Sequence, residues 1–157
     1  MNYIRATVVA ATVSLVFLAS PMTYAQGAAN EPLATGLIST GNAMAEVSGV
    51  IRDGDKLTIK VRFKPTQEGK SVSQVLYTGI TDQTYENSFY LLSGDKKYLL
   101  LKDSKGVPLA PNAVSLRGSG PLLATWSGVF PAPPAGQKVT LYLSGVEPLG
   151  PFAVPAE

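Results

Sequence analysis

Four cations recur along one short stretch of the sequence. Between residues 56 and 64, four apolar side chains alternate with the cations Lys56, Lys60, Arg62 and Lys64. In a β-strand this alternation places the cations on one face, where successive side chains stand about 7 Å apart, and the apolar residues on the other. Such a row can bind an anion or an acidic glycan, and we expect Lys60, Arg62 and Lys64 to form that surface. The alternative is an ordinary solvated strand face, whose lysines also discourage pairing between sheet edges.

Tyr85 is the second candidate binding residue. It lies in the polar stretch 79–87, which we expect to be a loop, and binding residues gather in loops. A tyrosine ring beside the cations would suit a glycan. The alternative is that Tyr85 packs against the domain, as we expect for Phe89, Tyr90 and Tyr98, which pair across a hairpin.

Catalytic chemistry has few residues to use. The chain has no cysteine and no histidine, which excludes thiolate zinc sites, cysteine nucleophiles and histidine general bases. The acidic turns 53–55 and 103–106 lack the dense set of oxygen ligands that calcium requires. We therefore expect no catalytic residue, no metal site and no cofactor. A hydrolase with two carboxyl groups about 5–10 Å apart is the enzymatic alternative, and its candidates are scattered through turns and loops, at Asp82, Glu86, Asp95 and Asp103.

The charge balance bounds the partners. The 157 residues contain 13 basic and 11 acidic side chains, which gives a net charge of +2. This balance exerts no general attraction on nucleic acid, so we expect no nucleic-acid partner.

The N-terminus has the layout of a secretory signal peptide. One cation, Arg5, precedes a short apolar run over residues 6–19, and Thr23-Tyr24-Ala25 supplies a cleavage site after Ala25. The run is shorter than the roughly 20 residues of a spanning helix, so we expect no transmembrane span in the mature chain. The predicted organisation is a signal peptide over 1–25, a flexible lead-in over 26–42 and one domain over 43–157. The predicted location is secreted or periplasmic.

The remaining pattern predicts an all-β domain without helices. We expect a first strand over 43–52 with Ala45, Val47, Gly49 and Ile51 facing the core, joined to the cationic strand by an Asp53-Gly54 turn. A second hairpin is expected over 88–102, with its strands buried on nearly both faces. Strands on either side of the proline corner 131–135 follow, and the first of them carries Trp126 as a core residue. About seven or eight short strands favour an antiparallel immunoglobulin-like sandwich, with a small barrel as the alternative.

Part of this pattern resembles a known family. The chain is similar to a family of uncharacterised bacterial extracytoplasmic immunoglobulin-like β-sandwich domains over residues 43–146. The likeness rests on the segments 89–92, 96–103 and 130–134 and on Trp126. It implies a sandwich fold and an envelope location, and it carries no active site. The chain lacks the cysteine by which anchored members of that family attach lipid.

Two hypotheses of function follow. The first is a non-enzymatic, secreted or periplasmic module that binds another envelope protein or stabilises an assembly through a sheet edge or end loops. The second is a glycan- or anion-binding domain that uses the cationic row with Tyr85.

Overall fold

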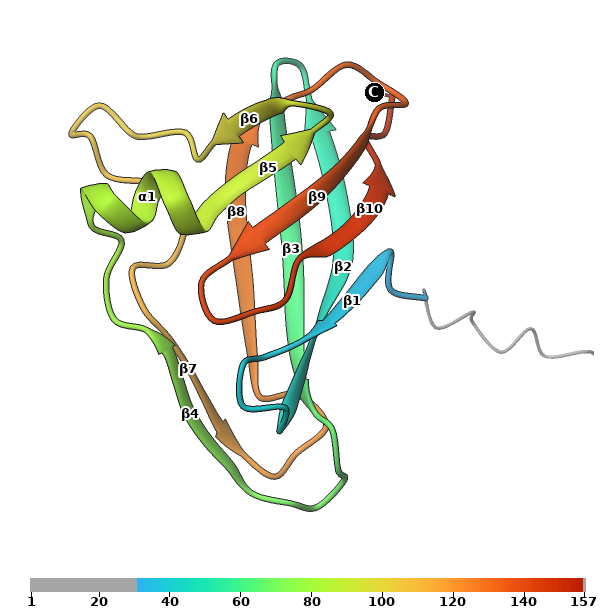
Figure 1. Ribbon diagram of the computed structural model, residues 1–157, viewed down its shortest axis with the longest axis vertical. Helices are drawn as coiled ribbons and strands as arrows, with labels where there is room; N and C mark the ends of the chain where they lie inside the picture. The colour runs from blue at the N-terminus through green and yellow to red at the C-terminus, as the bar shows by residue number, and fades with distance from the viewer. Residues whose placement is uncertain (1–30, 157) are drawn as a thin grey trace, which may run out of the picture.

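The cationic stretch forms a central strand of one of two four-stranded sheets. The computed structural model describes residues 31–156, which contain ten strands and one helix (Figure 1). The first sheet has the order β1-β2-β3-β8, and all its pairs are antiparallel. Its strands are β1 (Ala34–Leu37), β2 (Ala43–Asp53), β3 (Lys56–Pro65) and β8 (Ala124–Pro131). Since β3 lies between β2 and β8, its cations cannot serve as edge protection.

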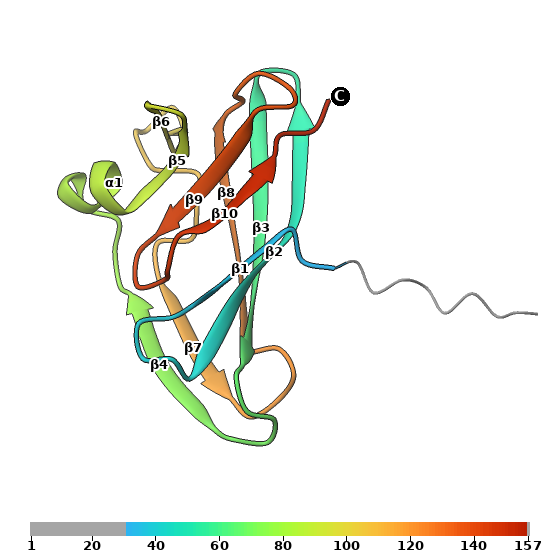
Figure 2. The same cartoon turned by 45° about the vertical axis from the view of Figure 1, so that its right-hand side comes forward.

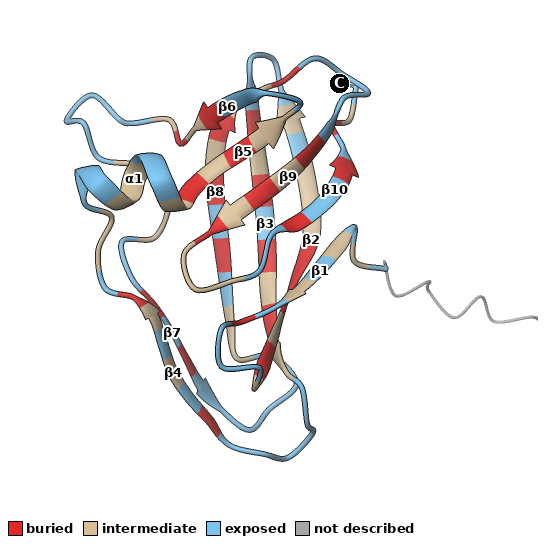
Figure 3. Cartoon of the chain, in the orientation of Figure 1, coloured by how far each residue is buried: buried red, intermediate tan, exposed pale blue. Residues whose placement is uncertain are grey.

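A second sheet covers the apolar face of the first. It has the order β10-β9-β5-β6 and contains β5 (Phe89–Ser93), β6 (Lys96–Leu99), β9 (Lys138–Leu143) and β10 (Leu149–Ala153). The core lies between the two sheets, as the buried bands in Figure 3 show. The four apolar residues of β3 that face the second sheet, Leu57, Ile59, Val61 and Phe63, are at most 1% exposed. None of the three sheets closes into a barrel, so the prediction of an all-β sandwich is confirmed.

A third, two-stranded sheet extends from one end of the sandwich. It pairs β4 (Val72–Tyr77) with β7 (Val114–Gly118), which are far apart in sequence (Figure 1). In the turned view β4 again lies on the outer side of this pair (Figure 2).

The prediction for the first strand is wrong in its second half. A β-bulge lies between Val47 and Gly49, because Val47 pairs with Val61 and Gly49 with Lys60, which leaves Ser48 as an extra residue. One added residue exchanges the two faces of a strand. Val50 therefore packs against the core, whereas Ile51 is 48% exposed. The expected turn is confirmed, and Gly54 at its centre has a φ of +56°.

Two elements were not expected. Residues 34–37, placed in a flexible lead-in, form β1, so the sandwich begins before residue 43. The stretch expected to be a loop contains α1 (Asp82–Ser88). Thr81 caps this helix: its hydroxyl accepts a bond from the Thr84 amide, and the Thr84 hydroxyl accepts one from the Thr81 amide.

The proline corner moves the chain from one sheet to the other. Trp126 is 2% exposed, as expected for a core residue. The strands on either side of the corner, β8 and β9, belong to different sheets and do not form a hairpin. β5 and β6 pair as the predicted second hairpin, but on β5 only Phe89 and Leu91 are buried, whereas Tyr90 and Leu92 on the other face are partly exposed.

The predicted signal peptide, residues 1–25, lies outside the described residues. Within residues 31–156, no helix is both long enough and apolar enough to cross a membrane.

Candidate functional site

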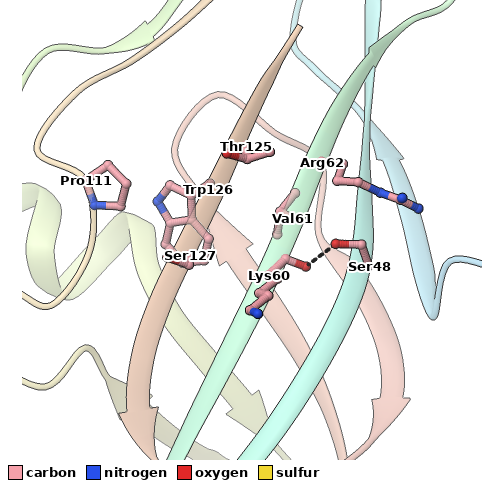
Figure 4. A pocket seen from close by; sticks show the side chains of 8 residues that line it. All are labelled: Ser48, Lys60, Val61, Arg62, Pro111, Thr125, Trp126 and Ser127. Carbon is pink, nitrogen blue, oxygen red and sulfur yellow. Dashed lines mark hydrogen bonds between the residues drawn. The ribbon is translucent and has the colours of Figure 1, made fainter. Parts of the chain in front are cut away.

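A hollow of about 440 Å³ lies over the outer face of the first sheet (Figure 4). Strand register explains why its polar residues meet: Lys60 on β3 faces Ser127 on β8, and Arg62 faces Thr125. Ser48, the bulged residue of β2, lines the third side, and its hydroxyl donates a bond of 3.3 Å to the Lys60 carbonyl. Pro111 stands beyond β8 as an apolar wall. The hollow thus combines two cations with three hydroxyl groups, and no carboxylate lines it.

Lys64 is not part of this hollow. Its ammonium nitrogen lies 2.8 Å from Oε2 of Glu46. Glu46 lies on β2 and is only 5% exposed; among residues 31–156 it is the one charged residue that is buried. The Glu46 carboxylate therefore holds the Lys64 ammonium and neutralises part of the cationic row that the sequence predicted.

Arg62 keeps unused hydrogen-bonding capacity. Its nearest guanidinium nitrogen is 3.7 Å from Glu46 Oε2, which is beyond hydrogen-bond length. Its buried Nε also has no acceptor among residues 31–156. The Glu46 charge therefore attracts the Arg62 guanidinium without occupying its donors, and the side chain remains 39% exposed.

Tyr85 does not join the cations of β3. It lies on α1, which contacts β5 of the second sheet, and it is absent from the lining of the hollow. Its hydroxyl donates to the carbonyl of Leu100, and the ammonium of Lys102 lies 4.0 Å from the centre of its ring. Burial, followed by the negative charge of Glu86, raises the pKa of Tyr85. These contacts give Tyr85 a packing role and separate it from the predicted glycan surface.

Two further tyrosines stack on the outer face of the second sheet. The rings of Tyr90 and Tyr142 lie 4.5 Å apart and are nearly parallel, at 12°. Lys97 places its ammonium 4.1 Å from the centre of the Tyr90 ring, so both faces of that ring are occupied. Burial and the neighbouring Tyr142 raise the pKa of Tyr90. This stack is an internal contact of the sheet surface and offers no free face of Tyr90 to a sugar.

A buried hydrogen-bond chain supports the β8 side of the hollow. The indole nitrogen of Trp126 donates a 3.0 Å bond to the hydroxyl of Tyr77, which in turn donates a 2.7 Å bond to the carbonyl of Pro111. Burial raises the pKa of Tyr77 to about 12, and the bond from Trp126 opposes this effect. These two hydrogen bonds connect β8 with β4 and with the loop that forms the apolar wall.

The carboxylates considered for catalysis occupy the helix and the turns, away from the lining of the hollow. Asp82 is in the first turn of α1, and Asp103 accepts backbone bonds from Lys105 and Val107. Among the described residues, no group of three or more acidic, histidine or cysteine side chains is placed to hold a metal ion.

The hydroxyl residues of the hollow were not among the predicted site residues. Thr125 and Ser127 flank Trp126 with the alternation of a strand, so their outward orientation could have been predicted. Their position beside Lys60 and Arg62 could not, because it requires the pairing of β8 with β3 across some 60 residues.

Comparison with known proteins adds no relative. No protein-family model matches the chain, and no curated protein or solved structure matches it either.

Proposed function

We propose that the chain is a non-enzymatic interaction module of the bacterial envelope, secreted or periplasmic, which binds a partner protein by adding a strand along β4. The all-β sandwich supports this proposal, as does the resemblance to extracytoplasmic immunoglobulin-like domains. The observation that carries it is the composition of the sheet edges.

Most strand edges are protected against pairing. The edge strand β6 carries Lys96 and Lys97, and β10 contains Pro151. The free side of β1 is covered at its end, where the Glu147 amide donates to the Leu37 carbonyl and the Glu147 carboxylate accepts from the Leu37 amide. The segment 101–109 covers β8 at Val129: the Leu101 amide donates to the Val129 carbonyl, and the Val129 amide donates to the Leu109 carbonyl. Lysines, prolines and coverage by other segments are the usual means of preventing uncontrolled strand pairing.

β4 lacks these protections over residues 72–75. Its sequence, Val-Ser-Gln-Val-Leu-Tyr, contains no charge and no proline. It pairs with β7 on one side, and within residues 31–156 no other strand pairs with it. The turn at Gly145 lies against Leu76, so the accessible part of the edge is residues 72–75, where Val75 is 45% exposed. An extended, uncharged segment of a partner can bond this backbone and contact Val75.

Cross-linking in envelope extracts tests the proposal, with Val75→Lys as the disrupting variant. A lysine on the edge places an unpaired charge in the new strand pair, so we expect the cross-linked partner to disappear. Val107→Lys is the matched control, because Val107 is similarly exposed, at 52%, and lies in the loop between β6 and β7. We expect this control to retain the partner. Recovery of the same partner by both variants would exclude β4, and the absence of any reproducible partner would contradict the interaction role.

A further inference from the structure

We propose that the hollow on the outer face of β2, β3 and β8 binds one carboxylated sugar unit of an acidic glycan. Arg62 and Lys60 bind the carboxylate, and the hydroxyls of Ser48, Thr125 and Ser127 bind the sugar hydroxyls. This site differs in place and ligand from the partner-binding edge of β4.

The electrostatics select an anion. Two cations line the hollow with no carboxylate among its lining residues. Glu46 is 5% exposed, and its closer cationic neighbour is Lys64, whose ammonium lies 2.8 Å from Oε2. Arg62 lies 3.7 Å from Glu46, which leaves its planar donors available. A guanidinium forms two parallel bonds to a carboxylate, which gives the pair direction as well as strength.

The remaining lining selects a sugar. Thr125 and Ser127 each carry a hydroxyl that can both donate to and accept from a polyol, and the Ser48 hydroxyl, which donates to the Lys60 carbonyl, can still accept. The ring of Pro111 supplies an apolar wall against which the C–H groups of a sugar ring can pack. The volume of about 440 Å³ falls within the range of about 300–1,000 Å³ that small ligands occupy.

The ligand covers only part of the cationic row. Lys64 is engaged by Glu46, and Lys56 lies at the far end of β3, outside the lining of the hollow. Lys60 and Arg62 are therefore the two cations that contact the bound unit. This restriction separates a defined site from a general attraction along the whole row.

Titration of the full chain with trigalacturonic acid tests the site, with the methyl-esterified trimer as the neutral probe. We expect salt-sensitive binding of the acid and none of the ester, because the carboxylate is the group recognised. The double variant Lys60→Gln/Arg62→Gln should weaken binding about tenfold or more, since two charge-assisted contacts are removed. The matched control Lys56→Gln/Lys138→Gln removes the same charge from exposed positions outside the hollow and should change the affinity less than about twofold.

Amide chemical-shift mapping of the wild-type chain provides a readout that does not depend on the variants folding. We expect the largest shifts on adding the acid at residues 48, 60–62 and 125–127. No binding of the acid, equal binding of the ester, an equal loss in the control variant or shifts centred elsewhere would each overturn the proposal. Displacement of the trimer by an equal concentration of inorganic phosphate would replace the sugar with a phosphate ligand, and would overturn it as well.

Discussion

Replacing Tyr77 with phenylalanine removes one hydroxyl from the middle of the buried chain that supports β8. Trp126 Nε1 then loses its acceptor at 3.0 Å, and the Pro111 carbonyl loses its donor at 2.7 Å. The ring itself remains, including its edge contact with Phe89, whose centre lies 4.9 Å away. The substitution therefore changes hydrogen bonding without creating a large cavity.

The expected loss of stability follows from the burial of the groups left behind. Trp126 is 2% exposed, and an unsatisfied buried donor costs about 1–3 kcal/mol. The bond to the Pro111 carbonyl contributes a further 0.5–1.5 kcal/mol, roughly. We expect Tyr77→Phe to lower the free energy of unfolding by about 2–4 kcal/mol at pH 7. Urea unfolding followed by the fluorescence of Trp126, the single tryptophan of the chain, measures it directly.

The Tyr77 hydroxyl also makes the difference in stability between the wild type and Tyr77→Phe depend on pH. Burial raises the pKa of Tyr77 from 10 in the unfolded chain to about 12 in the folded one. Stability from the protonated phenol is therefore complete below pH 10 and is lost as the pH rises through 12. A rise of two pKa units corresponds to at most about 3 kcal/mol, which the wild type loses over this interval and the variant does not, so the difference in stability between them narrows.

Tyr98→Phe is the matched control, because Tyr98 is also 8% exposed but lies outside the Trp126–Tyr77–Pro111 chain. We expect it to cost less than about 1 kcal/mol. A Tyr77→Phe variant as stable as this control, or a gap that stays constant between pH 9 and 12, would refute the reasoning.

Two pairs of substitutions test the packing of the first sheet. Gly128→Ala directs a methyl group into the ring of Trp126, so we expect the free energy of unfolding, measured in urea, to fall by about 1–3 kcal/mol. Gly49→Ala is the control: the nearest atom to its methyl group would be 3.9 Å away, so we expect a loss of less than about 0.5 kcal/mol. Val50→Ser should destabilise the fold by at least about 1 kcal/mol more than Ile51→Ser, because the bulge turns Val50 toward the core and leaves Ile51 48% exposed. Equal losses within either pair would contradict the packing described above.

Local signals in the sequence predicted the central strands well. The alternation over 56–64 identified both faces of β3, and Asp53-Gly54 identified the turn before it, because each depends only on neighbouring residues. The bulge at Ser48 could not be predicted in this way. The alternation of residues 43–52 fits a regular strand, and the extra residue appears only when β2 is paired with β3.

The candidate site also contains residues that local sequence patterns predict and residues whose role depends on strand pairing. Lys60 and Arg62 were predicted as surface cations, and both line the hollow. Lys64 was grouped with them because strand alternation does not show that Glu46, eighteen residues earlier, neutralises it. Thr81 is a favourable N-cap residue, but Thr84 stands where the sequence signature of a capping box has Glu or Gln, so the helix that carries Tyr85 was not predicted.

The bulge also connects the fold to the proposed sugar site. In a regular β2, Val47 opposite Val61 would be followed by Ser48 opposite Lys60, so Ser48 would face the hollow with or without the bulge. The bulge changes the residue after it, because Gly49 takes the place opposite Lys60. A Cβ at Gly49 would lie 3.9 Å from the Lys60 side chain, so the glycine leaves that side of Lys60 open. One irregularity therefore accounts for the failure of the simplest strand prediction and places a residue without a side chain beside one of the two cations.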